Sequence, residues 1–287
     1  MQWKTNKLSD LKKQYFSELV ALYEQHEAES LLGILIQHFF GLSRASLLVN
    51  PDFRLSESEI LSLHFAVKEL KKYRPVQYII GETEFLGLKI KVNEAVLIPR
   101  PETEELVQLI VSNEKEAHLN VLDIGTGSGC IAIALKKKMV EAHLSGIDIS
   151  TSALKLASEN CTINATNIKL EEINILDKNQ WKLLGYFDII VSNPPYVTHA
   201  EKTRMQDNVL KYEPHLALFV ADEKSLLFYE TIFELSEKHL NKNGRFYFEI
   251  NEAKGDEIVA LAKLKNFTNV KLHQDIHGKN RFVSGCK

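Results

Sequence analysis

Cysteine is scarce in this sequence of 287 residues, which has three, at positions 130, 161 and 286. The number is odd, and no two of them are close enough to form a CxxC pair. This pattern is typical of reduced thiols in a cytosolic protein and argues against a disulfide framework or a zinc site. The ten histidines show no ligand spacing. We therefore expect no bound metal.

Long apolar runs are also missing. The first residues, Met1–Lys4, contain no apolar segment of the kind found in signal peptides. The most apolar early run, Leu31–Leu42, is interrupted by Gln37 and His38 and is too short to cross a bilayer. These absences predict a soluble, cytoplasmic protein that does not associate with a membrane.

An excess of basic charge is missing as well, because 35 Lys and Arg residues face 38 Asp and Glu residues. A protein whose whole surface binds nucleic acid is usually basic. We therefore expect no direct nucleic-acid substrate, although a local basic patch remains open. The hydrophobic fraction of 45% is that of an ordinary globular protein. The length allows one large domain or two ordinary ones.

The periodicity divides the chain into three parts. Apolar residues recur at helical spacing up to about residue 73, and Ser56 with Glu59 forms a capping box. We expect residues 1–75 to form a small helical domain, either a stabilising appendage or a module that recognises a partner. Residues 76–101 are predicted to form a hairpin and linker. Residues 102–287 alternate between apolar β-branched runs and helical segments.

This alternation predicts an α/β domain with a mostly parallel, doubly wound sheet of seven strands. Its expected strands are Val121–Ile124, His143–Asp148, Asn167–Ile173, Phe187–Ser192, Arg245–Ile250 and two short ones near residues 269–273 and 281–284.

The first expected strand runs into a glycine-rich loop, Gly125-Thr126-Gly127-Ser128-Gly129. Alternate glycines let the backbone turn tightly and approach a ligand closely. The N–H groups at the start of the following helix favour an anionic group. The spacing is not the G-x-G-x-x-G of dinucleotide-binding proteins, because the third glycine comes one position early.

The second expected strand ends at Asp148. A carboxylate at this point can accept both hydroxyls of a ribose. Together with the glycine-rich loop one βαβ unit earlier, Asp148 predicts a nucleoside site.

The fourth expected strand, Phe187–Ser192, stops at Asn193-Pro194-Pro195-Tyr196. Two prolines in a row cannot continue a sheet. The turn therefore presents an amide, a rigid carbonyl and an aromatic ring where open α/β sheets bind their ligands. The Asn193 side-chain oxygen and the Pro194 carbonyl can accept both hydrogens of a planar nitrogen group and orient it towards a methyl donor. Tyr196 can cover that group.

The glycine-rich loop, Asp148 and Asn193–Tyr196 together resemble class I S-adenosylmethionine-dependent N-methyltransferases. Further segments resemble one branch, the PrmC/HemK family of enzymes that methylate the N5 atom of a glutamine in peptide chain release factors. These segments are Arg74–Gly81, Leu97–Glu104, Tyr212–Phe219 and Gly278–Arg281.

The resemblance implies that S-adenosylmethionine is the cofactor and that release factors, methylated on the glutamine of a Gly-Gly-Gln motif, are the partners. The helical domain and hairpin would help to dock the release factor, and we expect a monomer. The implied catalytic residues are Asn193, Pro194 and Tyr196, and Pro195 joins them in holding the glutamine.

The implied cofactor site consists of the glycine-rich loop and a few residues at strand ends. Its members are Gly125, Thr126, Gly127, Ser128, Gly129, Asp148, Asn174, Trp181 and Asn193. The residue that contacts adenine is Asn174 or Asp177. Asn174 is preferred because Ile175-Leu176 matches the apolar pair of the family, and Trp181 is expected to form a wall of the same pocket.

Other functions remain open at this point. An N-methyltransferase that acts on adenine or guanine in nucleic acid would use the same Asn-Pro-Pro-Tyr turn on a flipped base. A cofactor-binding module without catalysis and a nicotinamide-dependent oxidoreductase are weaker alternatives. Arg100, between two prolines, either rigidifies the linker or orients an acidic partner. Glu249 is expected to be structural or to support the site indirectly.

Overall fold

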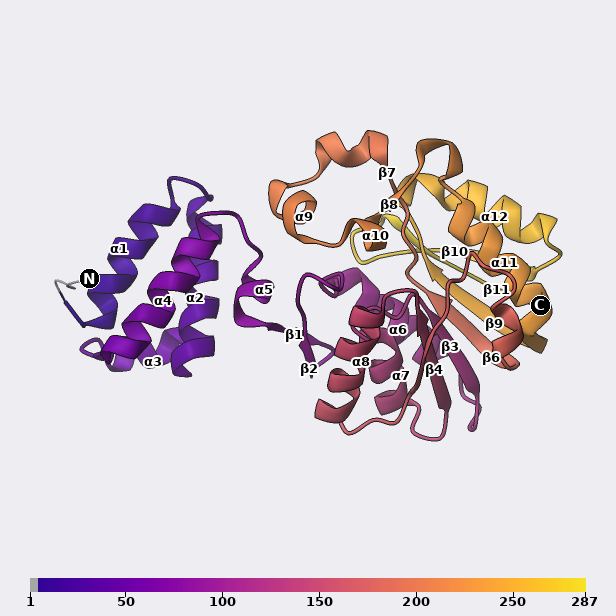
Figure 1. Cartoon of the computed structure of the whole chain (residues 1–287), viewed down its shortest axis with the longest axis horizontal. Helices are drawn as coiled ribbons and strands as arrows, with labels where there is room; N and C mark the ends of the chain where they lie inside the picture. The colour runs from indigo at the N-terminus through magenta and orange to yellow at the C-terminus, as the bar shows by residue number, and fades with distance from the viewer. Residues whose placement is uncertain (1–4) are drawn as a thin grey trace. The chain divides into compact units, whose positions relative to one another are not determined.

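The computed structural model describes residues 5–287, without the side chains of residues 44, 199, 204 and 223. The expectation for Met1–Lys4 therefore lies outside the described residues. The chain forms two compact units (Figure 1). The first comprises the described part of Met1–Gly81 together with Asp207–Tyr212, and the second comprises Glu82–Gln206 with Glu213–Lys287. The helical domain was predicted to end at residue 75.

The first unit is helical. Its helices are α1 (Leu8–Leu19), α2 (Gln25–Phe40), α3 (Arg44–Val49), α4 (Glu57–Leu70), α5 (Val76–Ile80) and α9 (Asp207–Tyr212). The capping box expected at Ser56 and Glu59 starts α4, and Gly41 ends α2 with a φ of 66°. The apolar faces of α1, α2 and α4 form one buried cluster.

The second unit begins with a hairpin of β1 (Glu82–Phe85) and β2 (Leu88–Lys91). Its centre is a sheet of seven strands in the order β10-β11-β9-β6-β3-β4-β5. The strands are β3 (Asn120–Ile124), β4 (His143–Asp148), β5 (Lys169–Glu172), β6 (Phe187–Ser192), β9 (Leu240–Glu249), β10 (Thr268–Gln274) and β11 (Asn280–Cys286). β11 is antiparallel to both of its neighbours, and the pairs among β5, β4, β3, β6 and β9 are parallel. The predicted mostly parallel sheet of seven strands is confirmed.

Helices cover the sheet in two groups (Figure 1). The first group is α6 (Pro101–Asn113), α7 (Cys130–Lys138) and α8 (Thr151–Ile163), and the second is α11 (Leu227–His239) and α12 (Gly255–Leu264). The chain moves outward from β3 to β5 in one direction and from β6 to β10 in the other. Right-handed crossovers therefore place the two groups on opposite faces.

A short excursion follows β6. It contains β7 (Val197–Thr198), α9, α10 (His215–Leu218) and β8 (Phe219–Val220), and β7 pairs with β8 in parallel. No helix among residues 5–287 is both long and apolar enough to cross a membrane.

Candidate active site

A cavity of about 430 Å³ lies at the carboxyl ends of β3, β4 and β6. The strand order reverses between β3 and β6, because β4 follows on one side of β3 and β6 lies on the other. Open α/β sheets bind ligands at this switch point. The predicted residues that line the cavity are Gly125, Thr126, Gly127, Ser128, Asp148, Asn174, Asn193, Pro194 and Pro195. Gly129, Trp181 and Tyr196 are not among its lining residues.

The glycine-rich loop reaches the cavity with its main chain. Gly125, Gly127 and Gly129 have φ values of 71°, 54° and 80°, in the left-handed region that favours glycine. The N–H of Gly127 donates to Asp148 Oδ2 over 2.9 Å. Gly129 is the N-cap of α7, where an added Cβ would lie 3.3 Å from Ala157 Cβ. Gly129 therefore brings α7 close to α8.

Asp148 lies at the end of β4 on the cavity wall. Its Oδ1 accepts from the N–H of Ser150 over 2.9 Å, and Gly127 holds the other oxygen. Each carboxylate oxygen has two lone pairs, so both retain capacity for a ligand hydroxyl. Burial raises the pKa of Asp148. The carboxylate is thus fixed in orientation and partly removed from water.

The segment after β5 forms the next part of the wall. Asn174 and Leu176 line the cavity, and Leu176 is 40% exposed although it is apolar. Ile149, on the β4 side, is also a lining residue and is 45% exposed. Exposed apolar side chains at a cavity suit a flat, apolar ligand group such as an adenine ring.

Asn174 and Asp177 are placed differently. Asp177 is not a lining residue, and its two oxygens accept from Asn179 N and Gln180 Nε2 within the local turn. Trp181 is buried at 3% exposure, and its indole N–H donates to the carbonyl of Ile175 over 2.9 Å. Trp181 thus lies behind the wall, where it supports the backbone of a lining residue. Of the two candidates, Asn174 is the one that lines the cavity.

The turn after β6 supplies the opposite wall. Ser192 is buried, and its hydroxyl donates to the carbonyl of Ile124, which ties the end of β6 to the end of β3. Asn193 Nδ2 lies 3.3 Å from Thr103 Oγ1, to which it donates. The Tyr196 hydroxyl donates to Glu249 Oε1 over 3.4 Å, and burial raises the pKa of Tyr196.

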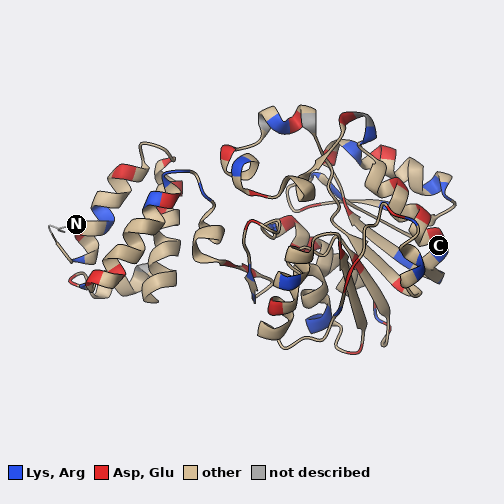
Figure 2. Cartoon of the chain, viewed as in Figure 1, with Lys and Arg blue, Asp and Glu red and all other residues tan. Residues whose placement is uncertain are grey.

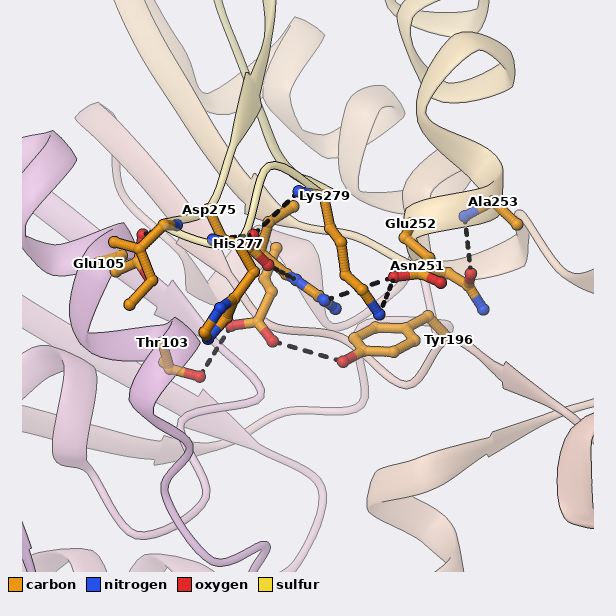
Figure 3. A network of polar contacts seen from close by, with 12 residues as sticks. Thr103, Glu105, Tyr196, Asn251, Glu252, Ala253, Asp275, His277 and Lys279 are labelled. Atoms are coloured by element: carbon orange, nitrogen blue, oxygen red, sulfur yellow. Dashed lines mark hydrogen bonds and ion pairs between the residues drawn. The ribbon is translucent and has the colours of Figure 1, made fainter. Parts of the chain in front are cut away.

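Thr103 and Glu249 were not among the predicted site residues. Thr103 is in the first turn of α6, is 3% exposed and lines the cavity. Its hydroxyl donates to Glu249 Oε2 over 2.7 Å. Figure 3 shows Thr103 and Tyr196 on opposite sides of the carboxylate that they share. The sequence did contain one signal for Glu249, because it places a carboxyl group inside the apolar run Phe246–Ile250. A carboxyl group that is buried needs hydrogen-bond partners.

Arg100 lines the cavity and forms an ion pair with the buried Glu213, with 2.6 Å between Nη2 and Oε1. The other oxygen of Glu213 accepts from the N–H of Ile98. The pair links two segments that are 113 residues apart. It therefore connects the predicted Leu97–Glu104 and Tyr212–Phe219 segments at one side of the cavity.

The Gly278–Arg281 segment places Arg281 close to Glu249 and Tyr196. Arg281 Nε donates to Asp275 Oδ2 over 3.1 Å, and its Nη2 lies 3.7 Å from Glu252 Oε2 (Figure 3). The positive charge of Arg281 lowers the pKa of Glu249, against the larger upward effect of burial.

Acidic and basic residues are interspersed along both units (Figure 2). The cavity wall shows the same mixture, with Asp148 on one side and Arg100 on another.

Two family models match the chain. The PrmC N-terminal domain matches residues 10–81, and the methyltransferase small domain matches residues 102–215. A release factor glutamine methyltransferase from Flavobacterium psychrophilum is 45% identical over 96% of this chain and 98% of its own length. The protein of the same name from Bacteroides thetaiotaomicron is 40% identical over 92% of this chain and 94% of its own.

Solved structures show the same fold. A methyltransferase from Pyrococcus furiosus superposes with a TM-score of 0.53 at 17% identity, over 81% of this chain and 99% of that one. A 16S rRNA guanine methyltransferase from T. thermophilus, solved with AdoMet and guanosine, gives 0.51 at 16% identity over 72% of this chain and 49% of its own. The fold is thus that of methyltransferases, and the near full-length relatives show that this chain belongs to the PrmC/HemK family of release factor glutamine methyltransferases.

Proposed function

We propose that this protein transfers the methyl group of S-adenosylmethionine to the side-chain amide nitrogen of the glutamine in the Gly-Gly-Gln motif of peptide chain release factors. The observation that carries the proposal is the shared cavity. The glycine-rich loop and Asp148 line one side, and the Asn193–Pro195 turn lines another. A methyl donor and a planar nitrogen acceptor can therefore meet in it. Membership of the family supports the same reaction.

The residues present fit the cofactor. Asp148 has lone pairs for the ribose hydroxyls, and Gly125 and Gly127 line the cavity without a side chain, so a ligand can approach the backbone closely. Ile149 and Leu176 offer apolar surface for adenine, with Asn174 beside them. When bound, S-adenosylmethionine supplies a methyl group on a positively charged sulfur.

The acceptor side orients the glutamine. Asn193 Nδ2 is bonded to Thr103, so the Asn193 oxygen is the atom left to accept an N–H of the substrate. The Pro194 carbonyl takes the second N–H. An amide nitrogen held in this way would face the methyl carbon, and orientation of this kind contributes strongly to rate. The nitrogen would gain the methyl group, the sulfur would keep the electron pair of the broken carbon–sulfur bond, and the nitrogen would lose one proton to water. No strong base is required, because the methylated nitrogen is very acidic.

The helical domain, residues 1–75, with the hairpin and linker of residues 76–101, is proposed to dock the release factor, while residues 102–287 carry out the transfer. The protein is proposed to act in the cytoplasm as a monomer. The match of residues 10–81 to the PrmC N-terminal domain supports a role specific to this family.

Mass spectrometry of a release factor incubated with the protein and S-adenosylmethionine tests the function. We expect a gain of one methyl group on the glutamine of the Gly-Gly-Gln motif, and none when that glutamine is replaced by alanine. DNA and RNA should be incubated in parallel. Methyl transfer to nucleic acid without transfer to the release factor, or to a different residue of the release factor, would overturn the proposal.

A further inference from the structure

A buried carboxylate connects two residues of the acceptor side. Glu249 ends β9 and is 1% exposed. Its Oε2 accepts from the hydroxyl of Thr103 over 2.7 Å, and its Oε1 accepts from the hydroxyl of Tyr196 over 3.4 Å (Figure 3). The proposed reaction uses neither oxygen directly. Burying a carboxylate is costly, so its position behind the cavity wall requires an explanation.

The charge on Glu249 fixes which atom donates in each hydrogen bond between Glu249, Thr103 and Asn193. A threonine hydroxyl has one hydrogen. Because Thr103 donates that hydrogen to Glu249, Thr103 Oγ1 can only accept at Asn193. Asn193 must then present its NH₂ group to Thr103, and its oxygen is left for the substrate.

We propose that Glu249 is a positioning residue that acts through Thr103 to hold the Asn193 amide with its oxygen available to the glutamine N–H, and that its ionised form is the active one. This inference rests on the proposed function. A protonated Glu249 can donate to Thr103, and Thr103 can then donate to the Asn193 oxygen. The Asn193 amide would turn over and present two N–H groups to a substrate that also presents N–H groups.

The surroundings of Glu249 bring its titration near neutral pH. Burial raises its pKa to about 7, and the Thr103 hydrogen bond and the charge of Arg281 oppose this rise. The titratable or charged groups that act on it come from five neighbouring segments. They are Glu102 of α6, Cys130 of α7, Tyr196 after β6, Tyr229 of α11 and Arg281 of β11, which is paired with Asp275. The turnover number should therefore fall as the pH falls through about 7.

The first test removes the hydroxyl without changing the shape of the side chain. Thr103→Val should lower kcat by about tenfold, the equivalent of one hydrogen bond, and leave the affinity for S-adenosylmethionine nearly unchanged. Thr103→Ser restores the hydroxyl and should restore most of the rate. The matched control is Thr231→Val, because Thr231 is also buried and donates only within α11, to the carbonyl of Leu227. It should keep the wild-type rate.

The second test removes the charge. Glutamine has one acceptor oxygen, so Glu249→Gln can accept from the hydroxyl of Thr103 or from that of Tyr196, and its NH₂ group must face the other hydroxyl. We expect kcat to fall by about tenfold and to lose its dependence on pH around 7. The matched control is Glu114→Gln, because Glu114 is also buried but pairs with Arg245 and Tyr247 at the end of α6. It should keep the wild-type pH profile.

The measurements are methylation of the release factor over a range of pH and calorimetric titration with S-adenosylmethionine. Thr103→Val and Glu249→Gln proteins that keep the wild-type rate and pH profile would overturn the positioning role and leave the proposed function standing. A wild-type protein that binds S-adenosylmethionine but leaves the glutamine unmodified would overturn both. If Glu249→Gln does not fold, the comparison of Thr103→Val with Thr103→Ser decides the outcome.

Discussion

The two sides of the cavity are built from different parts of the chain. On the proposed cofactor side, formed by the glycine-rich loop and Asp148, the main-chain N–H of Gly127 holds Asp148, which is 21 residues away within one βαβ unit. On the acceptor side, the side chains of Asn193, Thr103 and Glu249 hold one another across 90 and 146 residues. The cofactor side depends on backbone conformation, and the acceptor side depends on the direction of side-chain hydrogen bonds. Substitutions on the cofactor side should therefore change the affinity for S-adenosylmethionine, and substitutions on the acceptor side should change kcat.

Asn193→Ala should have the largest effect. It removes an acceptor that orients the substrate nitrogen, and loss of one such oriented group typically costs about a hundredfold or more in kcat. The affinity for S-adenosylmethionine should change far less. Single-turnover methylation and calorimetry measure the two quantities separately. A variant that loses cofactor affinity but keeps its rate at saturation would erase the distinction between the two sides.

Asp148→Ala should weaken binding of S-adenosylmethionine by about tenfold to a hundredfold, because hydrogen bonds to a charged group contribute about 1.5 to 3 kcal/mol. At saturating cofactor, kcat should change much less. Glu172→Ala is the control, since Glu172 also ends a strand but bonds to Thr151 on the surface. Calorimetry with both variants checks the result, and equal affinities would contradict a role for Asp148 in binding.

Glu249→Gln should change the pH dependence of stability. The folded-state pKa of Glu249 is about 7, against an ordinary value of 4.5. The folded state therefore retains a proton that the unfolded state releases, so this group makes the protein less stable as the pH rises from about 4.5 to 7. Glu249→Gln has no carboxyl group at this position, so its stability does not fall for this reason. Relative to wild type, its free energy of unfolding should rise by about 3 kcal/mol over that range.

Urea unfolding at pH 5 and at pH 8 measures this difference. A constant gap between the two proteins would mean that Glu249 does not titrate in this window. It would also remove the basis for expecting the turnover number to fall as the pH falls through about 7.

Trp181→Phe should have the smallest effect. It removes the indole N–H that holds the carbonyl of Ile175 behind the cofactor wall. Loss of one neutral hydrogen bond should cost about 1 kcal/mol of stability and weaken cofactor binding only a few-fold. Thermal unfolding and calorimetry check it. A loss of binding as large as that of Asp148→Ala would mean that Trp181 contacts the ligand directly.

The cofactor side could be predicted because its determinants are close in sequence. Gly125–Gly129 and Asp148 belong to consecutive strand ends, and the alternation of β-branched runs with helical segments places those ends at one edge of the sheet. The Asn193–Tyr196 turn could be located in the same way, because two prolines must end β6. The position of Trp181 behind the wall could not, since it depends on how the turn after β5 folds.

The sequence by itself determined the order of strands and helices, the turns that end them and the chemistry presented at three strand ends. These features follow from residue periodicity, from the φ values open to glycine and proline, and from the polarity of single residues. Only the tertiary structure decided that Thr103 of α6 bonds both to Glu249 of β9 and to Asn193. The reason is physical: a hydrogen bond requires contact within about 3 Å and a defined direction. Residues 90 and 146 positions apart acquire such contact only when the sheet and its helices pack together.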